Sequence, residues 1–237
     1  MNLLLFPEQA LSTEGILQVS GVQLQHLRNV LRSSIGDTIR VGKVNGSMGT
    51  GRVIEIDERR AVIDVTLDQS PPPKLALTLL LALPRPKMLR RILRMVAELG
   101  VGELHLINSY RVQKSYWQTP ILEDASIENY FMQGLEQARD TCLPSVNLQR
   151  RFKPFVEDDL PDLVSGKRAL VAHPGDYPPC PGPAAPLQHT VLAIGPEGGF
   201  IPYEIDMLQA AGFAPISLGP RILRVETAVP TLVAKLC

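Results

Sequence analysis

Two segments near the end of the chain decide the fold: Val191-Leu-Ala-Ile-Gly-Pro-Glu-Gly-Gly-Phe200 and Ile216-Ser-Leu-Gly-Pro-Arg-Ile-Leu-Arg-Val-Glu-Thr-Ala228. Each begins with an apolar run typical of a buried strand, continues through a glycine turn and leads toward a helix. Ligands of open α/β sheets bind beyond the carboxyl ends of the strands, so two such turns on neighbouring strands predict the walls of one pocket. Glycine lets backbone groups approach a ligand because no Cβ intervenes. Taken alone, either segment is also explained as a tight turn.

The C-terminal two thirds of the chain repeat this pattern of strand and helix. Helical patterns, including those at 87–99 and 122–138, alternate with apolar strand-like runs at 75–83, 103–107, 168–172, 190–194 and 213–218. Such alternation predicts an α/β domain over 75–237, a mostly parallel sheet with helices on both faces. The proline-rich stretch 178–186 is expected to be a loop.

Residues 1–69 have a different pattern. Runs rich in β-branched residues at 37–41, 51–56 and 61–67 are separated by glycine and asparagine, which predicts a small β-barrel. A short helix is expected at 26–32, with Leu27, Val30 and Leu31 facing the core. Consecutive prolines make 70–74 an extended linker between two domains.

The charge of this 237-residue chain is balanced overall and uneven locally. The 24 Lys and Arg residues equal the 24 Asp and Glu residues, yet residues 85–114 carry seven basic against two acidic side chains, a net charge of +5. Residues 115–164 carry four basic against nine acidic side chains, a net charge of −5. A basic surface on a neutral chain is one interpretation, and a solvated helix face is the other.

Several classes of protein are disfavoured. The chain has neither G-x-G-x-x-G after a strand nor G-x-x-x-x-G-K-[ST], which disfavours a pyrophosphate cradle. Its four histidines are scattered, and its three cysteines form no C-x-x-C pair, so we expect no metal site. The longest apolar run is far shorter than the roughly 20 residues of a membrane-spanning helix, and the first residues do not suggest a signal peptide, so we expect a cytoplasmic protein without a membrane partner.

The two glycine segments resemble the paired signature of the 16S ribosomal RNA (uracil-N3) methyltransferases, the RsmE family of SPOUT enzymes. Weaker similarities are His26-Leu-Arg-Asn-Val-Leu-Arg32, Glu98-Leu-Gly-Val101, Glu136-Gln137 and His173-Pro174. The resemblance implies a PUA-like RNA-binding barrel, a trefoil-knotted methyltransferase domain that binds S-adenosylmethionine, and a homodimer. It further implies 16S ribosomal RNA, or the small ribosomal subunit, as the partner and N3 of a specific uridine as the methylated atom.

The resemblance and the residue chemistry together give a set of candidate site residues. For cofactor binding these are His173, Gly195, Pro196, Glu197, Gly198, Gly199, Leu218, Gly219, Ile222, Leu223 and Thr227. For RNA binding they are His26, Arg28, Arg32, Arg90, Arg91 and Arg94, whose charges suit phosphates.

Arg224 and Glu226 are the candidate catalytic residues. Uracil N3 must lose a proton before it attacks a methyl group, and a fixed cation such as Arg224 favours the resulting anion. Arg221 is a weaker candidate for that cation. Glu226 and Thr227 are equally explained as residues that satisfy backbone donors at a helix start.

Three other interpretations stay open. Glu197 either shapes the pocket or serves as a first-turn carboxylate ahead of a helix from Pro202, and His173 is also explained as a structural histidine. The chain departs from the family pattern at Met95, Ile201 and Ala138-Arg139-Asp140. These departures leave open a divergent RNA-binding protein without catalysis, or a methyltransferase acting on another RNA.

Overall fold

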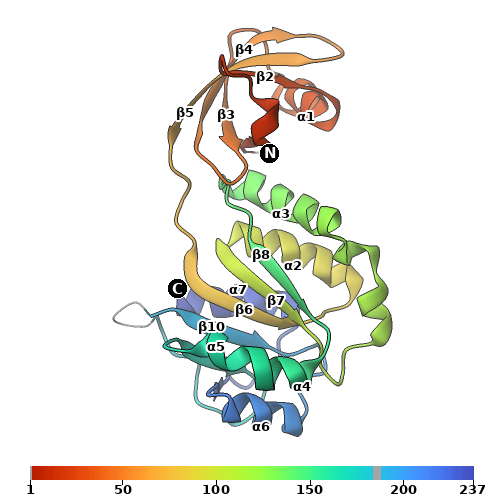
Figure 1. Cartoon of the computed structure of the whole chain (residues 1–237), viewed down its shortest axis with the longest axis vertical. Helices are drawn as coiled ribbons and strands as arrows, with labels where there is room; N and C mark the ends of the chain where they lie inside the picture. The colour runs from red at the N-terminus through yellow and green to blue at the C-terminus, as the bar shows by residue number, and fades with distance from the viewer. Residues whose placement is uncertain (1, 184–187) are drawn as a thin grey trace. The chain divides into compact units, whose positions relative to one another are not determined.

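The computed structural model describes residues 2–183 and 188–237 (Figure 1). The chain forms two compact units. The first consists of Met1–Pro73 and Phe131–Leu143, and the second of Lys74–Tyr130 and Pro144–Cys237. The segment Phe131–Leu143, expected within the C-terminal domain, therefore clusters with the N-terminal residues.

A five-stranded sheet forms the first unit, in the order β1-β3-β4-β5-β2. Its strands are β1 (Leu4–Phe6), β2 (Ile16–Val19), β3 (Thr38–Lys43), β4 (Met48–Ile56) and β5 (Ala61–Gln69). β1 pairs with β3 in parallel, and the other neighbours are antiparallel. Alternate residues point inward along β4 and β5, so one face of the sheet builds the core of this unit. The expected strands are confirmed, and β1 and β2 are added to them.

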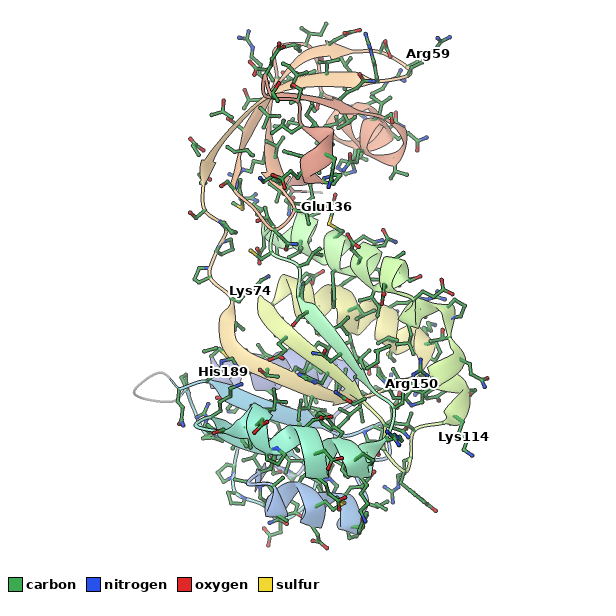
Figure 2. The ribbon with its side chains drawn as sticks, viewed as in Figure 1. Arg59, Lys74, Lys114, Glu136, Arg150 and His189 are labelled. Carbon is green, nitrogen blue, oxygen red and sulfur yellow. The ribbon has the colours of Figure 1, made fainter. Side chains whose placement is uncertain are left out.

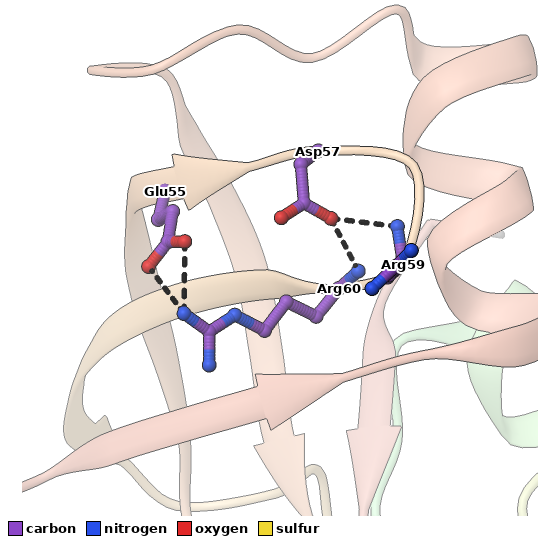
Figure 3. Close-up of polar contacts among 4 residues, drawn as sticks. All are labelled: Glu55, Asp57, Arg59 and Arg60. Carbon is purple, nitrogen blue, oxygen red and sulfur yellow. Dashed lines mark hydrogen bonds and ion pairs between the residues drawn. The ribbon is translucent and has the colours of Figure 1, made fainter.

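The turn between β4 and β5 is fixed by its own side chains (Figure 3). Asp57 Oδ1 accepts hydrogen bonds from the backbone N–H groups of Arg59, at 2.6 Å, and Arg60, at 2.8 Å. These bonds hold the pKa of Asp57 below its usual range. The guanidinium of Arg60 contacts Glu55 across the strands, with 2.9 Å between Nη2 and Oε1. A carboxylate that binds the next backbone amides is a common way to stabilise such a turn.

The expected helix at 26–32 is present, but its core-facing residues were partly wrong. The chain forms α1 (Gly21–His26) and then a π-helical segment, η2 (Leu27–Leu31). Leu27 is fully buried, whereas Val30 is 65% and Leu31 46% exposed. An α-helical spacing does not apply to a segment with i→i+5 hydrogen bonds, so the side chains after Leu27 rotate away from the core.

The second unit contains a six-stranded sheet in the order β11-β9-β10-β6-β7-β8. The strands are β6 (Leu75–Ala82), β7 (Val101–Ile107), β8 (Ser145–Gln149), β9 (Arg168–Ala172), β10 (Thr190–Ile194) and β11 (Ala214–Ile216). Every neighbouring pair is parallel, which confirms the predicted α/β fold. The order of the strands reverses between β6 and β10, so this unit has the type of switch point at which α/β proteins bind ligands.

Helices cover both faces of this sheet (Figure 1). The helices of this unit are α2 (Pro86–Glu98), α4 (Phe152–Pro154), η5 (Phe155–Asp159), α5 (Leu160–Val164), α6 (Pro202–Ala210) and α7 (Val225–Leu236). The helix α3 (Asp124–Ala138) begins in this unit and ends in the first. The shorter 3-10 turns of this unit are η3 (Lys114–Gln118) and η4 (Pro120–Leu122), and η1 (Glu8–Ala10) belongs to the first unit. In α2 the predicted apolar stripe is buried, from Met88 and Leu89 to Val96, while Arg90 and Arg91 are exposed.

Two further expectations concern this part of the chain. Residues 178–183 of the proline-rich stretch form no helix, whereas 184–186 lie outside the described residues. Within the described residues, no helix is long and apolar enough to cross a membrane.

Candidate functional site

A pocket lies at the carboxyl ends of β9, β10 and β11. About 640 Å³ of space not filled by protein atoms lies within it, and this figure includes space open to solvent. The wall combines the residues after all three strands with the first turns of α7. Its lining includes Ala172, His173, Pro174, Ile194, Gly195, Pro196, Glu197, Gly199, Ile216, Ser217, Leu218, Gly219, Arg221, Ile222, Leu223, Val225, Ala228 and Leu232.

The structure brings most of the candidate cofactor residues to this pocket. His173, the turn at 195–199 and the segment 218–223 all contribute to the lining of this one pocket. Gly198 and Thr227 do not line it, although both are next to residues that do. Arg221, the weaker candidate cation, is part of the lining.

The first glycine turn is narrow because its backbone packs closely on its neighbours. The amide of Gly199 donates to the carbonyl oxygen of Pro196 at 2.7 Å, and Gly199 has a φ of 73°. A Cβ on Gly199 would lie 3.3 Å from Cε1 of His173. A Cβ on Gly195 would lie 3.0 Å from the backbone nitrogen of Phe200. Glycine is therefore favoured at both positions, by the positive φ at Gly199 and by the limited space at Gly195.

His173 stands at the end of β9 with part of its hydrogen-bonding capacity unused. Its amide donates to the carbonyl oxygen of Ile216 at 3.0 Å, which fixes the backbone beside β11. Among the described atoms, the buried Nδ1 of its ring has no hydrogen-bond partner. Burial, and secondarily the positive charge of Arg111, lower the pKa of His173, which favours the neutral ring. The ring therefore lines the pocket in its neutral form, with this nitrogen buried within the protein.

Two arginines that were not singled out as site residues hold the same glycine turn. Arg85 precedes α2, and its Nε lies 3.2 Å from Oε1 of Glu197. Arg111 follows β7, and its Nη1 donates to the carbonyl oxygen of Gly198. The interpretation of Glu197 as a first-turn carboxylate was wrong, because Glu204 takes that place in α6 and binds the amide of Ile201 at 3.0 Å.

The second glycine turn is stabilised by Ser217. Its Oγ accepts a hydrogen bond from the amide of Gly219 at 3.1 Å, and its backbone bonds with Pro178 and Cys180. The turn is thus tied to the chain that follows β9. Because His173 also bonds Ile216, the two walls of the pocket are connected through backbone hydrogen bonds as well as by packing.

The candidate catalytic residues lie beside the pocket at the start of α7. Arg224 is exposed at the N-cap, and its carbonyl oxygen accepts from the amides of Thr227, at 2.9 Å, and Ala228, at 2.8 Å. Glu226 is half-buried in the first turn, and no side-chain cap forms at Arg224. The pocket-lining residues Leu223 and Val225 flank Arg224.

The candidate RNA-binding residues occur in both units. In the first unit His26 is half-buried, whereas Arg28 and Arg32 are exposed. In the second unit Arg90 and Arg91 are exposed on α2. Arg94 differs, because its guanidinium lies 4.8 Å from the ring centre of Tyr130 and its Nη1 donates to the carbonyl oxygen of Arg90 at 3.3 Å.

The lining of the pocket fits an amphipathic, nucleoside-like ligand. Ile194, Val225 and Leu232 supply apolar surface, while the glycine turns supply a few polar backbone groups. Nothing in the described part of the chain groups three or more His, Cys, Asp or Glu side chains as a metal site would.

Comparison with known proteins shows which family this chain belongs to. Residues 71–237 match a family model described as an RNA methyltransferase domain. Ribosomal RNA small subunit methyltransferase E of Treponema pallidum is 31% identical, over 96% of this chain and 87% of that protein. The protein of the same name from Synechocystis is 30% identical, over 99% of this chain and 76% of that protein.

A solved structure shows the same fold over both units. It is a ribosomal RNA small subunit methyltransferase E from Neisseria gonorrhoeae bound to S-adenosyl methionine, with a TM-score of 0.76 and 23% identity over 99% of this chain and 95% of that one. This match confirms the expected combination of a PUA-like unit with a SPOUT unit. The family model and the relatives together show that this chain belongs to the ribosomal RNA small subunit methyltransferase E family, the family that its two glycine segments resemble.

Proposed function

We propose that this protein transfers a methyl group from S-adenosylmethionine to N3 of one specific uridine in 16S ribosomal RNA. The observation that carries this proposal is the convergence of both glycine turns on one pocket, in a chain that belongs to a family of rRNA methyltransferases. The Neisseria relative, named as bound to S-adenosyl methionine, supports the choice of cofactor.

The pocket residues hold the cofactor in this proposal. Backbone groups of the turns at 195–199 and 217–219 bind the polar edge of the adenine, and Ile222 and Leu223 cover its apolar surface. Gly198 and Thr227 do not contact the cofactor in this proposal. Gly198 supports the turn at 195–199, and Thr227 supports the start of α7. Bound S-adenosylmethionine supplies an electrophilic methyl group on a sulfonium, and the chemistry needs chiefly that the two reactants be positioned.

Arg224 and Glu226 act on the uracil. The bond from sulfur to the methyl carbon breaks as the bond from that carbon to N3 forms, and the imide proton leaves N3. Glu226 accepts this proton, and the guanidinium of Arg224 stabilises the negative charge that develops on the base. The exposure of Arg224 beside the pocket leaves its side chain accessible to a nucleotide.

The remaining parts of the proposal concern the partners. Arg28, Arg32, Arg90 and Arg91, with His26 and Arg94, bind phosphates of the RNA, which set affinity and its salt dependence. We further propose a homodimer, a trefoil knot around the cofactor pocket and a cytoplasmic location, all of which rest on the family. The barrel over 1–69 binds RNA, the segment 70–74 is a linker and 75–237 carries the catalysis.

The decisive experiment compares Arg224→Ala with two other variants. Labelled methyl donor is incubated with small ribosomal subunits from a strain that lacks the enzyme, and the label is mapped on the RNA. Arg224→Ala is expected to lose at least 100-fold in turnover, the order of magnitude for one electrostatic donor, with cofactor affinity nearly unchanged. Arg221→Ala is expected to weaken cofactor binding, because Arg221 lines the pocket.

Lys235→Ala provides the matched control, because this exposed cation lies at the other end of α7. It is expected to leave both readouts unchanged. Wild-type turnover in Arg224→Ala would remove its assigned role. Wild-type protein that binds RNA but yields no methylated nucleotide would instead identify a family member without catalysis, and label on another RNA would change the substrate.

A further inference from the structure

Aromatic and basic side chains gather where β7 and β8 end, all of them exposed except Trp117, which is half-buried. We call Tyr110, Lys114, Trp117 and Arg150 the Tyr110 surface. The two strands are parallel neighbours, and the amide of Asn108, just after β7, donates to the carbonyl oxygen of Gln149 at 2.8 Å. Lys114 and Arg150 lie toward the same end of this sheet (Figure 2). The surface is therefore at the carboxyl edge of the sheet, as the pocket is.

Tyr110 is presented to solvent on a fixed backbone. The tyrosine is 79% exposed, yet its amide donates to Oε1 of Glu204 at 2.8 Å, and Glu204 is only 3% exposed. The hydroxyl of Ser109 binds the other oxygen of this carboxylate at 3.2 Å. A buried carboxylate from α6 thus orders the backbone that carries an exposed aromatic ring. Such an uncovered ring on a fixed backbone is suited to stacking on a ligand.

Trp117 and Arg150 form a second planar platform. The guanidinium carbon of Arg150 lies 5.1 Å from the centre of the indole ring, and its Nη1 donates to the carbonyl oxygen of Trp117 at 3.2 Å. The indole N–H is bound by Oδ1 of Asn108 at 3.0 Å. Both planes are therefore oriented by hydrogen bonds, and the guanidinium keeps further donors for a ligand.

The charge of this surface is not neutralised within the unit. Across the ranges 2–183 and 188–237, its cations Lys114 and Arg150 form no ion pair with a carboxylate, and neither does Arg111, which follows Tyr110 in the chain. Arg111 instead binds the carbonyl oxygen of Gly198, between two residues of the pocket wall. The Tyr110 surface therefore continues directly from the glycine turn that lines the pocket.

We propose that the Tyr110 surface binds the single-stranded RNA that flanks the methylated nucleotide. Bases stack on Tyr110 and on the pair formed by Trp117 and Arg150, while Lys114 and Arg150 contact phosphates. This proposal rests on the proposed function, since it takes RNA as the substrate. Planar groups interleaved with cations favour unpaired nucleotides over an acidic protein, for which aromatic platforms are not needed.

The test measures RNA binding separately from catalysis. The probe is a fluorescently labelled, uridine-containing single-stranded RNA, and affinity is read from anisotropy and from quenching of Trp117, the single tryptophan of the chain. Tyr110→Ala is expected to weaken binding by about 5-fold to 150-fold, the usual loss of one stacked base, and Tyr110→Phe to retain it. Arg150→Ala is expected to reduce the slope of log affinity against log salt by about 0.7, the value for one phosphate contact on a single strand.

The controls distinguish this surface from the cofactor site and from the reaction. Lys167→Ala removes a cation just before β9, at the amino ends of the strands and so away from the Tyr110 surface, and is expected to change neither affinity nor slope. Calorimetric affinity for S-adenosylmethionine is expected to stay at the wild-type value in Tyr110→Ala. The KM for small subunits is expected to rise in that variant, with kcat nearly unchanged.

Two results would overturn the assignment. One is wild-type RNA affinity in both Tyr110→Ala and Arg150→Ala. The other is that these variants lose affinity for assembled subunits but bind free RNA with wild-type affinity. That result would indicate a ribosomal protein as the partner. If RNA binding depends on Tyr110 but no methylated product forms, the surface stands while the proposed reaction fails.

Discussion

Nε of Arg85 lies 3.2 Å from Oε1 of Glu197, and this ion pair joins the loop after β6 to the glycine turn after β10. β6 and β10 are the neighbours between which the strand order reverses. The pair therefore spans the switch point of the sheet, beside the pocket wall. Its position indicates that it holds the turn in the conformation that lines the pocket.

Removal of this pair is expected to weaken cofactor binding slightly. Exposed ion pairs contribute about 0 to 1 kcal/mol, so Arg85→Ala should raise the Kd for S-adenosylmethionine by no more than about fivefold. Arg60→Ala is the matched control, since it breaks an exposed pair with Glu55 in the other unit (Figure 3). Calorimetry that gives equal Kd values for the two variants would show that the Arg85 pair does not support the pocket.

Gly199→Ala is expected to impair the pocket through a steric contact. An alanine at a φ of 73° is strained, and its Cβ would lie 3.3 Å from Cε1 of His173. We expect the free energy of unfolding to fall by about 1 to 2 kcal/mol and the Kd for the cofactor to rise about tenfold. Urea unfolding and calorimetry measure the two effects.

Gly212→Ala is the control that separates the effect of backbone strain from the effect of the contact with His173. Gly212 also has a positive φ, of 96°, but a Cβ there would meet open space. The stability loss is expected to be similar, with the Kd for the cofactor unchanged. Equal changes in Kd for Gly199→Ala and Gly212→Ala would mean that the contact with His173 is unimportant.

The sequence predicts the central strands well because they are buried on both faces. The runs expected at 168–172 and 190–194 coincide with β9 and β10. β8 was missed because it is the edge strand of the sheet, half-exposed and polar, without the apolar run that marks its neighbours. The same reasoning misplaced Val30 and Leu31, since apolar spacing does not reveal a π-helical segment.

The pocket was predicted from residues that lie close together in the chain. The distant residues that hold its turns in place were not predicted. Arg85 is 112 residues from Glu197, and Tyr110 is 94 residues from Glu204. Local patterns carry no information on such partners, which depend on the order of strands in the sheet. The glycine turns were recognisable because each forms its own motif.

Glu204 is expected to be a major contributor to stability. Its buried carboxylate accepts hydrogen bonds from the amides of Tyr110 and Ile201 and from the hydroxyl of Ser109. In Glu204→Gln, one oxygen becomes an amide donor that faces another donor, which leaves buried groups unsatisfied. We expect the free energy of unfolding to fall by about 2 to 4 kcal/mol, measured by urea unfolding.

Asp206→Asn is the control for this variant, because it changes an exposed carboxylate of the same helix. Its stability is expected to stay within about 0.5 kcal/mol of the wild type. A similarly small effect in Glu204→Gln would mean that the bonds seen at Glu204 contribute little.

Glu136 is expected to make stability depend on pH near neutrality. Burial raises its pKa to about 7, although the backbone amide of Leu5 donates to it and opposes the shift. Because the folded-state pKa lies above the ordinary value of 4.5, folding takes up a proton between these two values. The contribution of Glu136 to the free energy of unfolding should therefore be largest below pH 4.5. It should fall as the pH rises to about 7. After allowance for partial exposure, the decrease is expected to be about 1 to 2 kcal/mol.

Glu136→Gln tests this assignment because its amide stays neutral at every pH. Urea unfolding at pH 5 and pH 8 should show wild-type stability falling between the two, while the variant loses that fall and is the more stable protein at pH 8. Glu128→Gln removes an exposed carboxylate from the same helix and is expected to keep the wild-type profile. If Glu136→Gln retained the full decrease between pH 5 and pH 8, another group would be responsible, and the proton taken up on folding would not belong to Glu136.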